Sequence, residues 1–458
     1  MNGMDERRAE RWTADQVLAL APDVSSRKAG TGLAVAARWS GTGASGTAVW
    51  GLCAGGGGTP YRTVVDTAGP GCSCGCPSRK SPCKHALGLL LLWAGGEVGA
   101  AAHGGGRPDW VTEWLDARRA REERKSTGGS GAARGGDPEA ARKRAERRAA
   151  RVAAGATELE QRLEDLLRTG LAGAEREGYQ RWEETAARMV DAQAPGLASR
   201  VRELGALPGS GGDWPSRLLE ETALLHLLAR GCLRQGALPA PLAATVRSRV
   251  GYTVDSAELL AGPTVRDRWL VLARYDTADG RLTTRRTWLH GEAGGRPALL
   301  LSFGAAGRAP EPALPVGRRL DAELAFHPGA HPLRAVLGPR HGPPLPGGEP
   351  PGVPVATALG AYGEALAGDP WLDAWPVVLA GVVPIPGATG WQIADADGSD
   401  AVPVSAPGAG TGAGLWRLAA VSGGRPVTVF GELGHQGFRP FTAWGGGGTR
   451  PEPVPLTV

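Results

Sequence analysis

The stretch GCSCGCPSRKSPCKHALGLLLLW, from Gly71 to Trp93, places four possible metal ligands within twelve positions. They follow the pattern C-x-C-x(6)-C-x-H and are Cys74, Cys76, Cys83 and His85. Three thiolates and one imidazole make a closed tetrahedral ligand set for zinc, with no coordination position left open for a substrate. The stretch therefore predicts one structural zinc ion, Zn²⁺.

The residues around this pattern predict a strand, a turn and a helix. Gly75 allows a tight knuckle between the first two cysteines. Residues 84–94 are apolar nearly all round, which is typical of a short buried helix. Cys83 stands where this helix begins, and the positive end of the helix dipole favours a thiolate at that position.

Cys72 leaves other ligand sets open, because Cys72 and Cys74 form a second C-x-C pair. The first two ligands can therefore be Cys72 and Cys74 instead of Cys74 and Cys76. A cluster that binds no metal is a further alternative. Cysteines one residue apart suit a shared metal better than a disulfide with each other, because a bridge requires Cβ atoms about 3.8 Å apart in a particular orientation.

Three basic residues lie within the motif: Arg79, Lys80 and Lys84. Three thiolates and a neutral histidine around a divalent cation leave one net negative charge, which these side chains would offset. The same side chains could contact the phosphates of a nucleic acid. The sequence favours neither role over the other.

Three segments of the chain resemble the SWIM zinc finger of bacterial SWIM-family proteins. They are CPSRKSPCKHALGLLLLW from Cys76, WTADQVLALAPDVSSRKAG from Trp12, and WSGTGASGTAVWGLC from Trp39. The resemblance covers roughly the first 115 residues. It implies a strand-strand-helix shape, the ligands Cys74, Cys76, Cys83 and His85, and a role in DNA binding or protein interaction without catalysis. Cys72 departs from the family pattern, in which a single C-x-C precedes the Pro-Ser-Arg-Lys loop; Pro77 directly after Cys76 favours Cys74 and Cys76.

The hydrophobic pattern of the whole chain predicts an α+β, multidomain protein. At 458 residues the chain is about three times the usual length of one domain. We expect a SWIM-type zinc finger domain at 1–116, a basic flexible linker at 117–156, a helical region at 157–235, a β-rich region at 264–340, a Pro/Gly linker at 341–352, and a β-rich carboxy-terminal region at 353–458.

Local signals fix some element ends within these regions. Thr13 with Gln16 predicts a capping box at the first helix, and Thr157 with Glu160 predicts another at the start of the helical region. Asp279 and Gly280 separate two β-prone runs and predict a hairpin turn. Residues 139–154 contain strong helix formers but almost no apolar face, which is typical of a solvated helix or of disorder.

The charge of the chain is concentrated in one segment. The net charge is +5, and residues 117–155 contain twelve basic and five acidic residues, or +7, so the remainder carries −2. The longest apolar run, Ala86 to Ala94, is about half the length of a membrane span, and no amino-terminal targeting segment is recognised. We therefore expect a cytoplasmic protein that has no membrane association.

These observations together favour a non-catalytic interaction module. The zinc-stabilised amino-terminal domain would bind a protein partner or DNA, with Arg79, Lys80 and Lys84 as candidate nucleic-acid contacts. We identify no catalytic residue and no small-molecule substrate. The alternative is an enzyme of unknown type with its active site in the carboxy-terminal half, where no nucleophile, acid-base pair or phosphate loop is recognised.

Overall fold

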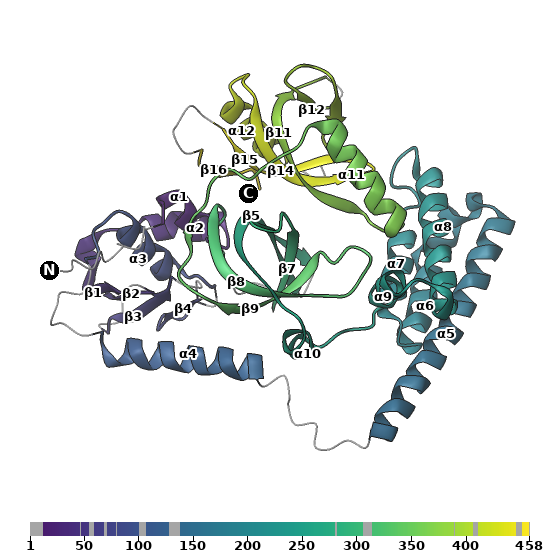
Figure 1. Ribbon diagram of the computed structural model, residues 1–458, viewed down its shortest axis with the longest axis horizontal. Coiled ribbons are helices and arrows are strands. Elements are labelled where there is room, and N and C mark those ends of the chain that lie inside the picture. Colours follow the sequence, from purple (N-terminus) through teal and green to yellow (C-terminus); the bar gives the residue numbers. More distant parts are fainter. Residues whose placement is uncertain are drawn as a thin grey trace.

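The computed structural model describes residues 12–45, 47–54, 59–67, 71–78, 80–99, 107–127, 138–279, 282–305, 314–388, 390–405, 411–445 and 451–457. Along the chain follow an amino-terminal sheet with helices on both faces, a helical bundle and two β-barrels (Figure 1). This arrangement confirms the α+β, multidomain fold class, with strands before a helix at the amino terminus, a helical middle and a β-rich carboxy-terminal part.

The amino-terminal sheet contains four antiparallel strands in chain order: β1 (Trp39–Ser45), β2 (Ala48–Cys53), β3 (Tyr61–Asp66) and β4 (Gly71–Cys74). It is preceded by α1 (Ala14–Leu18), α2 (Val24–Thr31) and the short 3₁₀ helix η1 (Ala36–Arg38). The capping box predicted at Thr13 is confirmed, since its hydroxyl accepts from the Gln16 backbone N–H and the Gln16 side chain accepts from the Thr13 N–H.

Helices cover both faces of this sheet. On one face lies α3 (Lys84–Ala94), whose leucines form a buried core with Val49 and Val65. On the other lies α4 (Asp109–Thr127), which packs against Ala48, Trp50 and Val64. Because neighbouring strand residues point to opposite faces, β2 and β3 supply both cores at once.

The helical middle region contains α5 (Pro138–Thr169), η2 (Leu171–Gly173), α6 (Ala174–Asp191), α7 (Pro195–Gly205), α8 (Trp214–Leu233), η3 (Gln235–Ala237) and α9 (Ala240–Val250). Its core is built of small and aliphatic side chains from α5 to α9, with Trp182 among them. The helices therefore continue to Val250, beyond the predicted end at residue 235.

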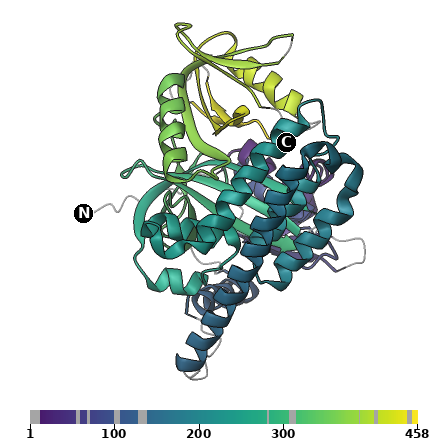
Figure 2. The same cartoon turned by 90° about the vertical axis from the view of Figure 1, so that its right-hand side faces the viewer.

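The predicted start of this region at Thr157 is wrong, because α5 begins at Pro138. Thr157 lies inside the helix, where its hydroxyl donates to the Ala153 carbonyl. The residues before it are helical despite their weak apolar face, and exposed ion pairs such as Lys143 to Glu139, at 2.6 Å, accompany them. Both views show this first part of α5 projecting from the bundle (Figures 1 and 2).

The first barrel follows α10 (Ser256–Ala261) and contains β5 (Val265–Asp279), β6 (Leu282–Gly291), β7 (Pro297–Ala305), β8 (Arg318–Phe326) and β9 (Arg334–Arg340). It is closed because β9 pairs with both β7, in parallel, and β8, antiparallel. The predicted hairpin is confirmed by the pairing of Asp279 with Leu282, while Gly280 lies outside the described residues. In the Pro/Gly stretch at 341–352, β10 (Leu345–Pro346) pairs with β8.

The second barrel follows α11 (Val355–Gly368) and contains β11 (Ala374–Ile385), β12 (Gln392–Asp395), β13 (Ala401–Pro403), α12 (Thr411–Ser422), β14 (Val427–Gly434), β15 (Gly437–Trp444) and the edge strand β16 (Pro453–Pro455). A parallel bridge between Val404 and Phe438 brings β13 to β15. Around the first barrel the strands follow the order β5, β6, β7, β9, β8, and around the second β11, β12, β13, β15, β14. Both orders are the Greek-key connectivity of an OB-fold.

The two barrels pack against each other through aromatic side chains. Tyr275 of β5 stacks on Phe441 of β15, with ring centroids 4.5 Å apart. The Glu432 carboxylate accepts from the Tyr275 hydroxyl at 2.9 Å and from the Trp288 indole N–H at 2.8 Å. The second barrel therefore covers much of the outer face of β5 and β6.

A tryptophan joins the bundle to the second barrel. Trp371, between α11 and β11, is 3% exposed, lies in the bundle core, and donates its indole N–H to the Leu224 carbonyl at 2.8 Å. Beside it, the Arg249 guanidinium donates to the buried Asp369 carboxylate at 2.6 Å. On the other side of the first barrel, Arg274 of β5 donates to the Ala19 carbonyl just after α1.

We predict that Trp371→Ala lowers the free energy of unfolding of the helical region by about 3–5 kcal/mol, because it leaves a cavity in the bundle core and removes the indole hydrogen bond to the Leu224 carbonyl. Urea unfolding followed by far-ultraviolet circular dichroism measures the change. Trp416, 65% exposed on α12, is the control. It makes an edge-to-face contact with Trp391, so its replacement by Ala should lower stability by no more than about 1.5 kcal/mol. Equal shifts in both variants would contradict the role of Trp371.

Candidate metal centre

The four predicted ligands come from the end of the amino-terminal sheet and the start of α3. Cys74 is the last residue of β4, and Cys76 lies in the turn that follows. Cys83 is the N-cap residue of α3, and His85 is in its first turn. The sequence thus folds locally as predicted, with strand, turn and helix each contributing to one site.

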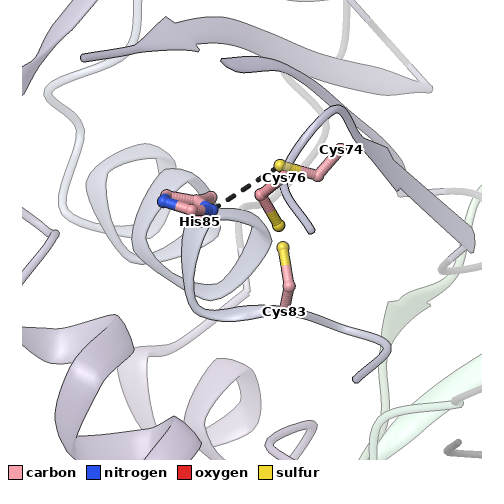
Figure 3. Close-up of side chains that lie close together, drawn as sticks. All are labelled: Cys74, Cys76, Cys83 and His85. Atoms are coloured by element: carbon pink, nitrogen blue, oxygen red, sulfur yellow. Dashed lines mark hydrogen bonds between the residues drawn. The ribbon is translucent and has the colours of Figure 1, made fainter. Parts of the chain in front are cut away.

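The four side chains converge (Figure 3). Their ligand atoms, three sulfurs and one imidazole nitrogen, all lie within 4.8 Å of one another. The Cys74 Sγ is 3.6 Å from the Nδ1 of His85. Cys83 and His85 are only 3% and 5% exposed, whereas Cys74 and Cys76 are half-buried. The site therefore has a buried side against α3 and a partly open side at the turn.

This arrangement fits a tetrahedral zinc ion. Zinc binds thiolate sulfur at about 2.3 Å and imidazole nitrogen at about 2.0–2.1 Å, so two such ligands in a tetrahedron lie about 3.6 Å apart. The Cys74 to His85 distance has this value. Bound there, zinc would tie β4 and the turn to the first turn of α3, and Cys74, Cys76, Cys83 and His85 would complete its coordination.

Cys72 lies outside this group. It is on β4 two residues before Cys74, and its Sγ is 3.4 Å from the Ser81 hydroxyl in the loop before α3. Of the two candidate pairs, the structure brings Cys74 and Cys76 together with Cys83 and His85. The Cys72 thiol instead helps to hold the loop to the strand.

Two side chains of β3 support the ligands and were not found by sequence reasoning. Thr63 is paired with Cys74 across the sheet, and its hydroxyl is 3.3 Å from the Cys74 Sγ. The Tyr61 ring lies against the His85 imidazole, with centroids 5.0 Å apart. Both belong to an ordinary β-prone run, so only the register between β3 and β4 places them at the site.

The surroundings of the three thiols shift their pKa values in different directions. The Cys83 thiol donates to the Cys74 sulfur, which lowers the pKa of Cys74 to about 5 although burial opposes this shift. The same hydrogen bond, together with burial, raises the pKa of Cys83, and burial raises the pKa of Cys76. Three adjacent thiolates in this partly buried place require a cation, and a zinc ion supplies the compensating charge.

The basic residues of the motif have different environments. Lys80 forms an ion pair with Asp23 at 2.8 Å and donates to the Ser25 hydroxyl at 3.2 Å, so it joins the finger loop to the start of α2. Lys84 is exposed at the first position of α3. Arg79 lies outside the described residues. Of the two candidate nucleic-acid contacts that the structure describes, Lys80 is thus held in an ion pair and Lys84 is exposed.

The geometry defines the class of the site as a Cys₃His zinc finger built on a strand, a turn and a helix. Comparison with protein families identifies which finger it is. The family model of the SWIM zinc finger matches residues 61–94, and that of the SWIM-associated four-helix bundle domain matches residues 147–250. The chain therefore contains a SWIM-type zinc finger and a SWIM-associated helical bundle, and its amino-terminal domain is a zinc-binding module. Comparisons with curated proteins and with solved structures gave no match.

The helical match extends over α6 to α9 and most of α5. The bundle and the finger are thus two associated parts of one architecture, separated in the chain by α4. Across the described ranges, none of the helices combines the length and the apolar character needed to cross a bilayer.

Metal analysis tests the ligand set. We expect Cys72→Ser to keep the zinc content of the wild-type protein, and Cys74→Ser, Cys76→Ser, Cys83→Ser and His85→Ala each to contain one zinc per chain fewer. Plasma emission spectrometry on purified protein gives the stoichiometry. Loss of zinc in Cys72→Ser together with its retention in Cys76→Ser would replace the proposed first pair, and a wild-type protein without zinc would refute the site.

Removal of the metal should loosen α3, because a structural zinc site contributes its binding free energy to folding. We expect chelation to accelerate amide hydrogen exchange in residues 84–94, while the barrels at 265–457 keep their protection. Hydrogen exchange followed by mass spectrometry measures both regions in one experiment. Unchanged exchange in residues 84–94 after complete removal of zinc would show that the apolar contacts of α3 suffice alone.

Proposed function

We propose that this chain is a non-catalytic scaffold that binds a protein partner through its zinc-stabilised amino-terminal domain. The observation that carries the proposal is the ion pair between Lys80 and Asp23. A finger loop whose lysine is already neutralised is a weak attractor for phosphate, and it suits a protein surface of mixed polarity better than a polyanion.

Two contacts hold the Asp23 carboxylate beside Lys80 at the start of α2. It caps α2 by accepting from the Ser26 N–H at 2.7 Å, and it accepts from the Lys80 ammonium at 2.8 Å. The hydrogen bond from Lys80, together with those from Ser25 and Ser26, holds the pKa of Asp23 below its usual range. A phosphate at Lys80 would therefore compete with an intramolecular carboxylate that the fold itself orients.

The non-catalytic part of the proposal is supported by the ligand set. A structural zinc bound by three thiolates and one imidazole has no open position at which to activate water or polarise a substrate. The metal fixes α3 against the sheet, and the Arg274 contact with Ala19 joins this domain to the first barrel. The domain would then present a rigid surface that is anchored to the rest of the chain.

The test separates the protein partner from DNA. Fluorescence anisotropy with labelled duplex and single-stranded DNA is measured from low to high salt, with wild type and with Arg79→Ala and Lys84→Ala. We expect weak affinity that changes little in either variant. A steep loss of affinity with salt, reduced by about one unit of slope for each lost phosphate contact, would overturn the proposal in favour of nucleic acid.

A partner is sought by affinity capture from nuclease-treated lysate of the source cells. Cys83→Ser, which removes a ligand, is compared with Cys72→Ser, which retains all four. We expect a protein that is captured by wild type and Cys72→Ser and is lost with Cys83→Ser. Capture that disappears on nuclease treatment, or that is equal in both variants, would contradict binding of a protein through the zinc-stabilised domain.

A further inference from the structure

We propose that the helical bundle contains a second metal site, distinct from the finger, formed by Glu160, Glu164 and His226. Glu160 and Glu164 lie one turn apart on the same face of α5, and His226 faces them from α8. One carboxylate oxygen from each glutamate and the Nε2 of His226 lie within 4.8 Å of one another. This set of one imidazole and two carboxylates suits a divalent transition metal such as Zn²⁺.

The distances fit a metal ion better than hydrogen bonds. The Nε2 of His226 is 3.6 Å from the Oε1 of Glu160 and 3.7 Å from the Oε1 of Glu164. Both exceed the usual N–H···O range of 2.7–3.2 Å. Zinc bonds of about 2.0–2.2 Å to nitrogen and oxygen place tetrahedral neighbours about 3.4 Å apart, so a small closure of the three side chains would complete the site.

The imidazole nitrogen is an independent sign of a missing ligand. The Nε2 of His226 is buried from solvent and has no hydrogen-bond partner among the described residues. A buried polar atom without a partner destabilises the fold. A cation placed between this nitrogen and the two carboxylates would satisfy it.

Two arginines define the electrostatics of the site. Arg168 donates to the other oxygen of Glu164 at 2.8 Å, which orients that carboxylate and leaves its Oε1 toward His226. Arg230, on α8 one turn after His226, has its Nε 3.4 Å from the same Glu160 oxygen. Arg230 is 42% exposed, so it can turn away into solvent when a metal ion takes its place. Arg230 therefore competes with the metal for the Glu160 carboxylate.

Such a site would join α5 to α8 through a metal ion. Three protein ligands leave at least one coordination position for water, unlike the closed ligand set of the finger. The cluster lies in the bundle, on the opposite side of the molecule from the amino-terminal sheet and α3 (Figure 1). The two sites can therefore be titrated and altered separately in one chain.

The experiment is a Co²⁺ titration of full-length protein followed by visible absorption, together with Zn²⁺ calorimetry on protein whose finger is already loaded. The finger gives intense sulfur-to-cobalt charge-transfer absorption, whereas the second site has only nitrogen and oxygen ligands. We expect a second equivalent that adds no charge-transfer absorption. Glu160→Gln and His226→Gln should each weaken its affinity at least about tenfold and leave the finger signal unchanged.

Two further variants keep the proposal falsifiable if ligand substitutions disturb the bundle. Arg230→Gln removes the competitor and should strengthen binding at the second site. Glu158→Gln, also on α5 but paired with Arg162 and Arg188, should leave the affinity unchanged. A single equivalent in wild type and in Arg230→Gln, or equal affinities in Glu160→Gln, His226→Gln and Glu158→Gln, would overturn the proposal and leave an ordinary ion-pair network.

Discussion

The amino-terminal domain of this structure depends on one electrostatic requirement: the three cysteine sulfurs that lie together can all be thiolates only around a cation. A hydrogen bond with Cys74, together with burial, raises the pKa of the Cys83 thiol, and burial raises the pKa of Cys76, so the fold alone disfavours ionising all three thiols. A divalent ion bound by the four ligands would favour the ionised form of each thiol. A bound ion would also link the turn after β4 to α3. The turn has few apolar side chains with which to pack, whereas α3 is apolar nearly all round.

The consequences of that coupling extend beyond the finger. With α3 fixed on one face and α4 on the other, the amino-terminal sheet is buried on both sides, and the segment around Ala19 is held where Arg274 reaches it. The first barrel packs on the second through Tyr275, Phe441 and Glu432, and Trp371 joins the second barrel to the bundle. These contacts join the amino-terminal domain, the two barrels and the bundle in series.

The zinc ligands could be predicted from the sequence because all four lie within twelve positions, and local spacing nearly determines which side chains can share an ion. The same locality made the capping box at Thr13 and the hairpin at Asp279 predictable. The helix start predicted at Thr157 was wrong because a capping pattern is also compatible with a helix interior. There a threonine hydroxyl can donate to the carbonyl four residues before it. The position of Thr63 at the site and the closure of the first barrel by β7 and β9 could not be predicted, since both depend on the register or pairing of separate strands.

The two barrels show why the carboxy-terminal half gave no functional signal. They share strand connectivity although the sequence has no repeat of fixed period, so the similarity lies in the pairing order and not in the residues. In OB-folds the outer face of the second and third strands is the usual ligand surface. Here part of that face on the first barrel carries Trp288 and Leu299, which pack with Phe430 and Phe441 of the second barrel. Because these residues hold the two barrels together, this part of the ligand face of the first barrel is not open to an external ligand.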